Sequence, residues 1–598
     1  MRFWTLVVLT APLLCAQQST QPAQQESIVV TGTAEPVPLA EADRDVSVMQ
    51  LPEQQRPLFN SWFDLIQLDP ALDLQERAPG GFQADLSIRG ATFGQTLVLL
   101  NGLRINDVQT GHFNLDLPIP IEMISGMEVL KGSGSTLYGS DAIGGVVNVL
   151  TQQIDKPEFR LLGGAGNFGF NQEHAIGSFG GYWWQQEFAA ARDFSTGFIP
   201  DRDYRNLDLS SLSTLKSRLG ATILLFAYSD RPYGADQFYG PYPSWERIKT
   251  WFYSAQQNLG DKTEASFDFR RHTDLFVLFR DDPQLYTNRH LEDTWQGALR
   301  RHDNLPLHGV LSYGVEGLSE SINSNNLGIH SRERGSGYVF YDLRSVRRYS
   351  LSLGIREEVY GAHQVATSPS LSGAAWLSAR YKLRAAVTRA FRLPSYTELY
   401  YSDPYDLGNP NLKPESATSY EVGFDAYVKT NLHAAVTVFQ RRDTNLIDYV
   451  RANPNDVWQA ENFDKLRFTG VEASAVYDLK PNQHFSLSFS GLQGVNQSNQ
   501  LLESKYAFNF PVHSGVVEWR GTVMKNVLAR TRIGVVDRIG QSPYALWEAS
   551  AGYTAGRFRP FFQLTNITNT SYQDIPGVVL PGREIIGGME LWLFGAGK

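Results

Sequence analysis

Alternation of apolar and polar residues recurs along most of the chain and limits the fold more than any other feature. In the segment SYEVGFDAYVKTNLHAAVTVFQ (419–440), apolar residues at every second position face polar or small residues between them, on both sides of a short KTN turn. HFSLSFSG (484–491) alternates in the same way. Because successive side chains of a strand point to opposite faces, these segments predict strands with one apolar and one polar face.

The turns between these segments are of two kinds. Short turns such as KTN and LKPNQ alternate with long polar loops, for example residues 230–247 and 394–416. This asymmetry is typical of barrels with short periplasmic turns and long outer loops, and about 440 residues suffice for about 22 strands of about 10 residues each. No apolar run after residue 16 reaches 18 residues. We therefore expect an all-β transmembrane barrel of about 22 antiparallel strands over residues 153–598, although a secreted soluble β-protein would alternate too.

Composition agrees with an exported β-protein and argues against a nucleic-acid partner. Charged residues make up only 19% of the chain, aromatic residues 12%, and the net charge is -9. A protein that neutralises phosphates needs a basic surface, so no nucleic acid is expected to bind.

The N-terminus predicts an export signal followed by a tether. Arg2 precedes an apolar stretch, and cleavage after Ala16 would remove residues 1–16 together with Cys15, the single cysteine. Residues 17–49 form a polar tether that contains the apolar island ESIVVTGT. Such an island is suited to adding a strand to a partner's sheet, and it could equally be the first strand of the next domain.

Residues 50–152 read as a compact α+β domain that could fill the lumen of a wide barrel. SWFDLIQLDPAL has helical spacing, with Ser61 as an expected N-cap and Pro70 as a stop, while DLSIRG, TLVLLNGLRIN and MEVLKG predict short strands. The glycine-rich segment at 130–151 has neither the spacing of a phosphate loop nor that of a nucleophile elbow. Its glycines are therefore expected to serve tight turns and close backbone approach.

Several motifs, which occur along the chain in the order given below, resemble those of TonB-dependent outer-membrane receptors. ESIVVTGT is similar to the TonB box, and LSIRGATFGQTLVLLNGLRIND with GMEVLKGSGSTLYGSDAIGGVVNVLT resembles the plug. RAFRLPSYTELYY with GNPNLKPESATSYEVGFD resembles the mid-barrel signature, and residues 561–594 resemble the closing strands. The family commonly ends on an aromatic residue that the barrel-insertion machinery reads, whereas Phe594 is followed here by GAGK.

The resemblance implies active import across the outer membrane of a Gram-negative bacterium. The implied partners are the energy-transducing TonB complex, outer-membrane lipid, the barrel-insertion machinery and a small metal-chelate substrate, with the receptor acting as a monomer. GHFNLDLPIP and FSTGFIPDRDYRN are similar to the cobalamin-receptor group, which implies a corrinoid substrate. A ferric siderophore is the alternative within the family, and a passive porin is the alternative outside it.

Candidate functional residues follow from these assignments. Coupling to TonB is expected at Ser27, Ile28, Val29, Val30 and Thr31. Breakable polar contacts of the plug are expected at Arg89, Arg104, Glu122, Glu128 and Lys131. Substrate is expected to face Phe93, Gln109, His112, Phe113 and Asn114, with His112 also considered as a ligand to a corrinoid metal.

Metal-binding and catalytic patterns are sparse. Asp201 and Asp203 flank Arg202 in an expected outer loop, and their carboxylates could bind calcium. The eleven histidines show no zinc-ligand spacing such as H-E-x-x-H, and no nucleophile, base and orienting acid occur together in a motif. We expect a transporter without catalysis of its own and without a required cofactor.

Overall fold

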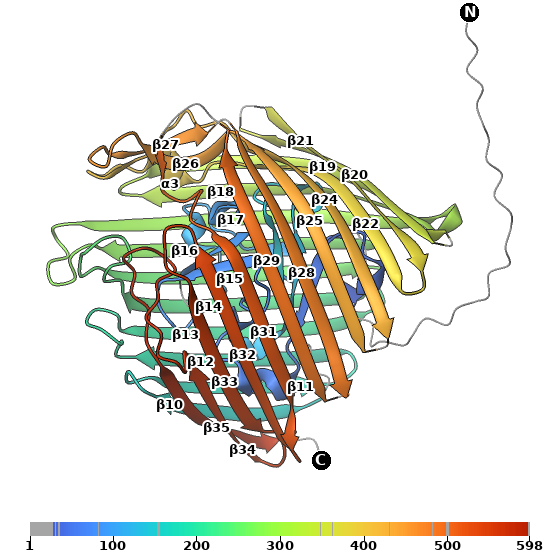
Figure 1. The fold of residues 1–598 in the computed structure, drawn as a ribbon, viewed down its shortest axis with the longest axis horizontal. Helices are drawn as coiled ribbons and strands as arrows, with labels where there is room; N and C mark the ends of the chain where they lie inside the picture. The colour runs from blue at the N-terminus through green and yellow to red at the C-terminus, as the bar shows by residue number, and fades with distance from the viewer. Residues whose placement is uncertain are drawn as a thin grey trace, which may run out of the picture.

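A closed barrel of 22 antiparallel strands surrounds the N-terminal part of the chain (Figure 1). The computed structural model describes residues 28–29, 31–33, 36–81, 83–151, 156–346, 348–361, 363–429, 431–463, 465–480, 482–497 and 502–595. Closure comes from the pairing of the first barrel strand, β10 (Glu158–Gly166), with the last, β35 (Glu584–Phe594). The predicted fold class, a transmembrane-type barrel with an N-terminal plug, is confirmed.

The remaining barrel strands follow one another in chain order. They are β11 (Asn171–Gly180), β12 (Trp184–Ser195), β13 (Tyr204–Ser217), β14 (Gly220–Gly234), β15 (Trp245–Leu259), β16 (Thr263–Val277), β17 (Thr287–Leu305), β18 (Gly309–Ser324), β19 (Gly328–Val346), β20 (Tyr349–Tyr360), β21 (Gln364–Ser378), β22 (Tyr381–Arg392), β24 (Glu415–Lys429), β25 (Leu432–Thr444), β28 (Leu466–Lys480), β29 (Gln483–Asn496), β31 (Pro511–Met524), β32 (Val527–Arg538), β33 (Tyr544–Tyr553) and β34 (Phe558–Thr565).

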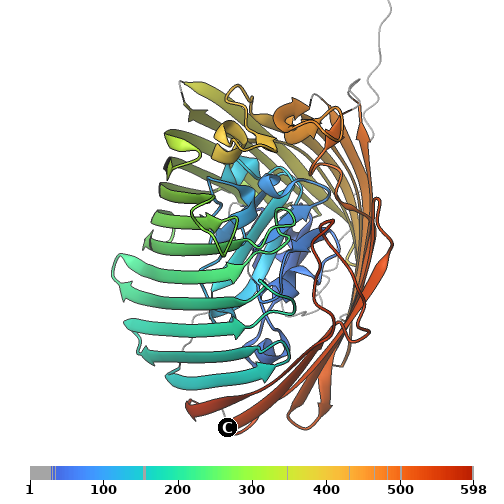
Figure 2. The ribbon, with the colours of Figure 1, turned by 90° about the vertical axis from the view of Figure 1, so that its left-hand side faces the viewer.

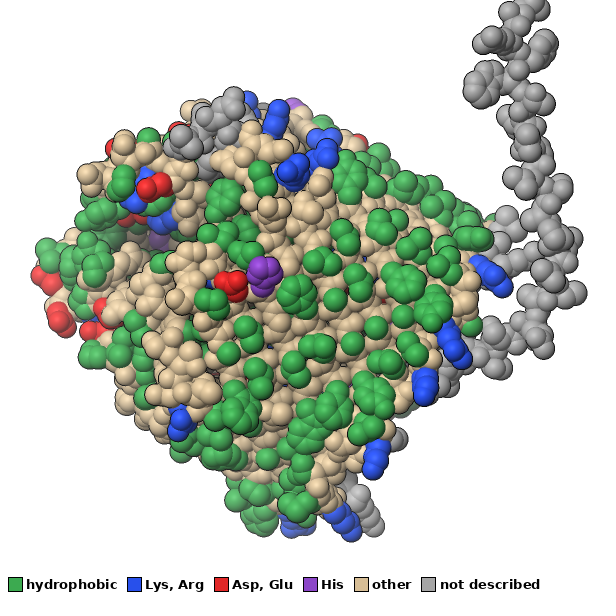
Figure 3. Space-filling model, viewed as in Figure 1, with side chains coloured by type: hydrophobic (Ala, Val, Ile, Leu, Met, Phe, Trp, Pro, Cys, Tyr) green, Lys and Arg blue, Asp and Glu red, His purple; other side chains and the backbone are tan. Residues whose placement is uncertain are grey.

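The period-two alternation places apolar side chains on the outside of the barrel. On β24, Tyr420, Val422 and Phe424 are exposed, while Glu421 and Asp425 at the alternate positions are buried toward the lumen. Figure 3 shows hydrophobic side chains spread over the barrel wall, with Lys and Arg side chains along its lower right edge. The wall therefore presents an apolar outer surface around a polar interior, as a strand-built membrane wall requires.

The plug lies inside this wall, as the turned view shows (Figure 2). Its main sheet has the order β3-β8-β9-β6-β7 and includes a parallel pair, β6 with β9. The bounds are β3 (Val46–Gln50), β6 (Thr96–Leu100), β7 (Leu103–Arg104), β8 (Ile124–Lys131) and β9 (Gly145–Thr151), with a separate hairpin of β4 (Leu72–Glu76) and β5 (Ala84–Ile88). Since β3 joins this sheet, the plug begins before the expected boundary at residue 50.

The helices are short. They are α1 (Phe63–Ile66), α2 (Ser135–Tyr138), α3 (Tyr396–Tyr400) and the 3-10 turns η1 (Leu39–Glu41), η2 (Glu53–Leu58), η3 (Phe93–Gln95), η4 (Gly111–Phe113), η5 (Ile121–Met123) and η6 (Pro306–His308). None of the helices in the described parts of the chain has the length and apolar character needed to span a bilayer.

The helix expected from residue 61 is shorter than its apolar spacing predicts. Trp62, not Ser61, occupies the N-cap of α1, and the Ser61 hydroxyl accepts a hydrogen bond from the Phe63 amide at 3.2 Å. After Ile66 the backbone tightens, with Leu68 N–H donating to Leu65 O at 3.2 Å. Pro70 follows at once and β4 starts at Leu72, so the chain has no room for further helical turns.

The glycine-rich segment lets the plug backbone lie close to the barrel wall. Gly139 has φ of +77°, and a Cβ there would lie 2.6 Å from the Glu358 carboxylate on β20. A larger residue would be strained in its backbone and would also push the plug away from the barrel. This geometry agrees with the expectation of tight turns and bare backbone.

A second small sheet lies among the loops that follow the barrel strands. It has the order β23-β27-β26-β30, with β23 (Asp406–Leu407), β26 (Leu446–Arg451), β27 (Trp458–Phe463) and β30 (Glu503–Ser504). These strands come from the long loops between β22 and β24, β25 and β28, and β29 and β31. The sheet therefore ties together three loops on the side opposite the short turns.

Candidate functional site

The segment similar to the TonB box pairs with the strand that follows it in the chain and contacts the plug through Thr31. β1 (Ile28–Val29) pairs antiparallel with β2 (Val37–Pro38), with Val29 opposite Val37. Thr31 is buried, its amide donates to the Glu128 carboxylate at 2.7 Å, and its hydroxyl accepts from Asn148 Nδ2 at 3.1 Å. Ser27 and Val30 lie outside the described residues. An extended segment is thus present here, already paired within its own chain.

A buried ionic cluster joins the plug to the barrel wall. Arg89 forms a two-point contact with Glu472 on β28, Nε to Oε1 at 2.7 Å and Nη2 to Oε2 at 2.9 Å. It also contacts Glu421 on β24 at 3.0 Å and Asp45 of the plug at 2.8 Å. Lys131 Nζ lies 3.4 Å from Glu472 Oε2. Burial alone would raise the pKa of Asp45, but Lys131 and nearby guanidinium groups hold that pKa well below its usual range.

The other residues expected at plug contacts differ in where they reach. Glu122 Oε1 lies 2.6 Å from Nδ1 of His174 on β11, so this contact also crosses from plug to barrel. Burial opposes ionisation, yet His174 lowers the pKa of Glu122 to about 2. Arg104 instead bonds within the plug, to Asp141 Oδ2 at 2.6 Å. Glu128 accepts the amide of Thr31, so it holds the N-terminal segment.

The apex of the plug carries a histidine backed by a carboxylate. Nδ1 of His112 lies 2.7 Å from Asp85 Oδ1, and Arg77 Nη2 holds the other oxygen of Asp85 at 2.9 Å. The His112 ring stacks on Phe93 at 4.3 Å, and the Tyr506 ring stands edge-on to Phe93 at 5.1 Å. The side chain of His112 is 15% exposed. Burial lowers its pKa against the opposite effect of Asp85, so the ring is neutral at pH 7 with its proton on Nδ1.

Three other residues expected to face substrate are buried beneath this apex. Gln109 Nε2 donates to Asp274 of β16 at 3.0 Å, and Phe113 belongs to a buried apolar cluster. Asn114 Nδ2 donates to the carbonyl of Phe93 at 3.2 Å. Because these side chains are buried, they do not reach the outer face. They instead stabilise the loop that carries His112.

Sequence reasoning proposed Phe93 and His112 as substrate-facing residues, which stays a prediction, and it did not single out the residues that support them. Asp85 lies in DLSIRG, a segment that predicts a strand but does not by itself assign a role to the carboxylate. Tyr506 is more than 390 positions from His112 along the chain. A carboxylate inside a buried strand is a signal that could have singled out Asp85, whereas no local pattern points to Tyr506.

Two cations of the outer loops are paired with carboxylates. Lys505 Nζ lies 2.7 Å from Asp406, and Arg451, whose guanidinium stacks 4.2 Å from the Trp458 ring, pairs with Glu503. At these two positions, aromatic rings lie beside cations whose charge is already balanced by a carboxylate.

The two aspartates considered for calcium are paired in the same way. The guanidinium of Arg280 contacts Asp201 Oδ1 at 3.1 Å and both oxygens of Asp203. A positive group already occupies the space between the two carboxylates. Calcium binding there stays a prediction, and it would require Arg280 to move aside.

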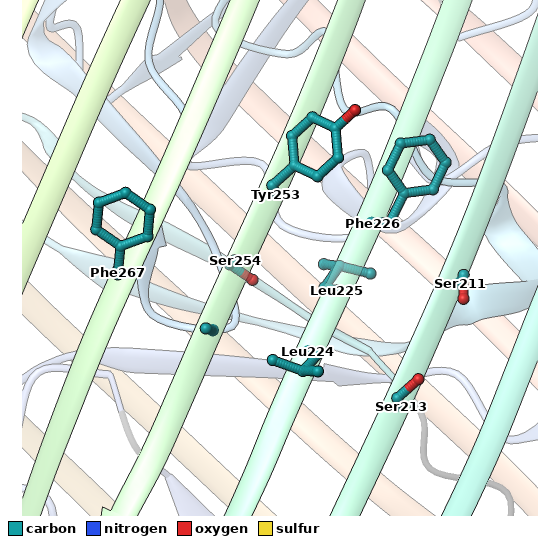
Figure 4. Close-up of a pocket in the computed structure, with 9 residues that line it drawn as sticks. Ser211, Ser213, Leu224, Leu225, Phe226, Tyr253, Ser254 and Phe267 are labelled. Atoms are coloured by element: carbon teal, nitrogen blue, oxygen red, sulfur yellow. The ribbon is translucent and has the colours of Figure 1, made fainter.

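A shallow hollow on β13–β16 lies on the outer wall and not at the plug (Figure 4). Leu224, Tyr253 and Phe267 border it and are exposed on the outer face, while Leu225 between them is buried against the plug core. Because its rim consists of outward-facing side chains, the hollow belongs to the apolar surface of the barrel.

Two family models match the two parts of this architecture. A plug domain model, described as TonB-dependent receptor plug domain, matches residues 38–146, and a model described as TonB dependent receptor-like, beta-barrel matches residues 142–568. Together they span both the plug and most of the barrel.

Curated proteins and solved structures are similar as well. Proteins named vitamin B12 transporter BtuB match from Photobacterium profundum, 25% identical over 502 residues and 79% of each chain, and from Vibrio vulnificus, 24% identical over 603 residues and 94% of each chain. The siderophore receptor PirA from Acinetobacter baumannii has a TM-score of 0.76 at 15% identity, covering 92% of this chain and 98% of its own. The FrpB iron transporter from Neisseria meningitidis has a TM-score of 0.76 at 14% identity, covering 92% and 99%. At such identities the structural likeness concerns the fold alone.

Proposed function

Since the chain belongs to the TonB-dependent receptor family, we propose that it imports a corrinoid across the outer membrane of a Gram-negative bacterium. Substrate binds at the plug apex and the outer loops, and the TonB complex supplies the energy from the periplasmic side. The protein acts as a monomer embedded in outer-membrane lipid, inserted there by the barrel-assembly machinery. No catalytic step is part of this function.

The observation that best supports active transport is that ion pairs hold the plug against the barrel wall. The plug lies inside the barrel, so passive flow through an open pore is not the proposed route. Its contacts with the wall include ion pairs at Arg89, Glu122 and Lys131. Such contacts can be exchanged for contacts with water when the plug moves, unlike tightly interlocked apolar packing.

Coupling is proposed at Ser27, Ile28, Val29, Val30 and Thr31. The pairing of β1 with β2 supports this, because a strand that pairs within the plug can exchange that partner for a strand of TonB. The contacts of Thr31 with Glu128 and Asn148 would then retain the segment until substrate binds.

A corrinoid is favoured over a ferric siderophore by two observations. Curated relatives that match most of the chain include proteins named vitamin B12 transporters. The outer cations Arg280, Arg451 and Lys505 each pair with a carboxylate, which leaves them less available to a strongly anionic iron chelate.

The test is growth of a deletion strain that depends on either nutrient. Loss of growth on limiting cobalamin, with growth on ferric siderophores retained, is the expected result. Calorimetry on the purified receptor then measures cobalamin binding directly. Binding of a ferric siderophore without cobalamin binding would reverse the substrate assignment and leave the transport role in place.

A further inference from the structure

Three arginines form a row across the barrel wall. They are Arg389 on β22, Arg442 on β25 and Arg467 on β28, and we call them the arginine row. Arg389 and Arg442 both lie opposite Thr418 of β24, and Arg442 lies directly opposite Arg467. Since paired strands are about 4.7–4.9 Å apart, the row crosses four neighbouring strands within about 15 Å.

The arginine row faces away from the lumen. The residues that follow Arg389 and Arg467 in the chain, Ala390 and Phe468, are buried, as is Arg441, which precedes Arg442. Arg389 and Arg442 are exposed, and Arg467 is half-buried. Because successive side chains of a strand point to opposite faces, the row lies on the outside of the wall and does not reach a substrate held at the plug.

The protein does not balance the positive charge of the row. Among the residues that the structure describes, Arg389 and Arg467 have no hydrogen bond or ion pair, and Arg442 Nε donates to the neutral Oε1 of Gln440 at 2.9 Å. The Arg442 guanidinium also lies 5.7 Å from the Tyr420 ring. Like charges directly opposite each other destabilise a strand pair, so the position of Arg442 opposite Arg467 calls for an anion from outside the chain.

Arginines elsewhere on the outer face have a carboxylate partner. Arg247 on β15 makes two hydrogen bonds to the Asp230 carboxylate, at 2.8 and 2.7 Å. Arg271 on β16 makes two hydrogen bonds of 2.7 Å to the Asp293 carboxylate. Unbalanced charge therefore distinguishes the arginine row from these positions of the same wall.

The row stands at the outer border of the apolar surface. Arg389, Arg442 and Arg467 each lie within three residues of a strand end that leads into an outer loop. Further along the same strands, Val387 and Val438 are exposed on the outer face. Figure 3 shows hydrophobic side chains across this part of the wall and Lys and Arg side chains near its upper border. Cations above an apolar band match the headgroup and the acyl chains of an anionic lipid.

We infer that the arginine row binds the phosphate groups of a lipid in the outer leaflet, whose acyl chains lie along the valine surface below. Guanidinium groups bind phosphate through paired hydrogen bonds, and three of them can hold more than one phosphate. A free phosphate ion would balance the charge but leave the adjoining apolar surface unused, so a lipid is the ligand that fits both. This site goes beyond the import function and does not depend on the imported substrate.

The test measures lipid binding to the purified receptor in detergent by native mass spectrometry. The probes are bisphosphorylated lipid A, the same lipid without its phosphates, and inorganic phosphate as a competitor. We expect the phosphorylated form to bind more tightly and inorganic phosphate not to displace it. Arg442→Gln should weaken its binding about fivefold, and the triple variant that adds Arg389→Gln and Arg467→Gln about a hundredfold.

Arg271→Gln is the matched control, because it removes an outward-facing arginine whose charge Asp293 already balances. Its affinity for phosphorylated lipid A should equal that of the natural receptor. Lipid A without phosphates should bind the triple variant and the natural receptor alike, which separates lost phosphate contacts from a general change of the wall. Heat-modifiable migration on a gel checks that each variant is folded.

Three results would overturn the inference. One is equal binding of the two forms of lipid A to the natural receptor, and another is unchanged binding of the phosphorylated form by the triple variant. The third is a loss in Arg271→Gln as large as in Arg442→Gln, which would show a charge effect of the whole wall. Displacement by inorganic phosphate would assign the row to free anions and overturn the lipid as its ligand.

Discussion

Arg89 of the plug and Glu472 of the barrel face each other through two parallel hydrogen bonds, 2.7 and 2.9 Å long, although they are 383 positions apart in the chain. Both side chains are almost fully buried. The arrangement gives the plug one defined seat in the lumen, because a guanidinium and a carboxylate make two parallel bonds in only one relative orientation.

Removing one partner of this pair should loosen the plug. In Arg89→Ala, Glu472 would be left buried without the guanidinium that binds both of its oxygens, while Glu421 would keep Arg44 as its hydrogen-bonded cation. We expect a cost of about 3–5 kcal/mol in the free energy of plug unfolding. Denaturant titration with a probe in the plug measures this. Arg192→Ala is the control, since its pair with Glu173 is exposed and contributes under about 1 kcal/mol. Equal stability of the two variants would contradict the role given to the cluster.

Uptake should depend on the backbone of the N-terminal segment more than on its side chains. Val29→Pro removes an N–H and fixes φ, so we expect it to abolish energised uptake while substrate binding at the outer surface stays intact. Val29→Ala should have a much smaller effect. Surface binding and accumulation in energised cells measure the two steps separately. Normal transport by Val29→Pro would show that residues 27–31 are not the coupling segment.

Acid should weaken the contact of Glu122 with His174 and so lower the stability of the plug in the barrel. The pKa of Glu122 is about 2, below the ordinary value of 4.5, so its contribution is complete above pH 4.5 and is lost as the pH falls toward 2. The loss amounts to about 3 kcal/mol at most. Plug unfolding followed at pH 6 and pH 3 tests this, with Glu122→Gln as the comparison. A natural receptor as insensitive to acid as Glu122→Gln would contradict the assignment.

A charge on the outer wall should interfere with the membrane-embedded barrel. Leu487 lies on the outer face of β29 and is 56% exposed, so Leu487→Arg would put a guanidinium against lipid at a cost of up to about 2–4 kcal/mol. The folded fraction in lipid vesicles, read from heat-modifiable migration, should fall. Val457→Arg, in an outer loop, should leave this fraction unchanged. A soluble fold would tolerate both substitutions alike.

Local patterns in the sequence predicted the strands and their faces. On β24 and β29, the period of two depends only on neighbouring residues, so Phe424 and Leu487 could be assigned to the apolar face from the sequence. The helix from residue 61 was predicted too long, because spacing does not show that β4 must begin at Leu72. The sequence of a loop likewise does not show which residues from other parts of the chain its side chains will contact.

The sequence by itself determined the architecture. Its strands alternate in polarity and close into a barrel wall, and this wall surrounds a plug whose tight turns contain glycine. Tertiary structure alone decided the contacts between distant residues. Arg89 and Glu472 come together, Arg280 lies between Asp201 and Asp203, and Tyr506 lies beside His112. The physical reason is that alternation is encoded residue by residue. The partner of a buried side chain, in contrast, depends on how the closed barrel and its plug are registered against each other.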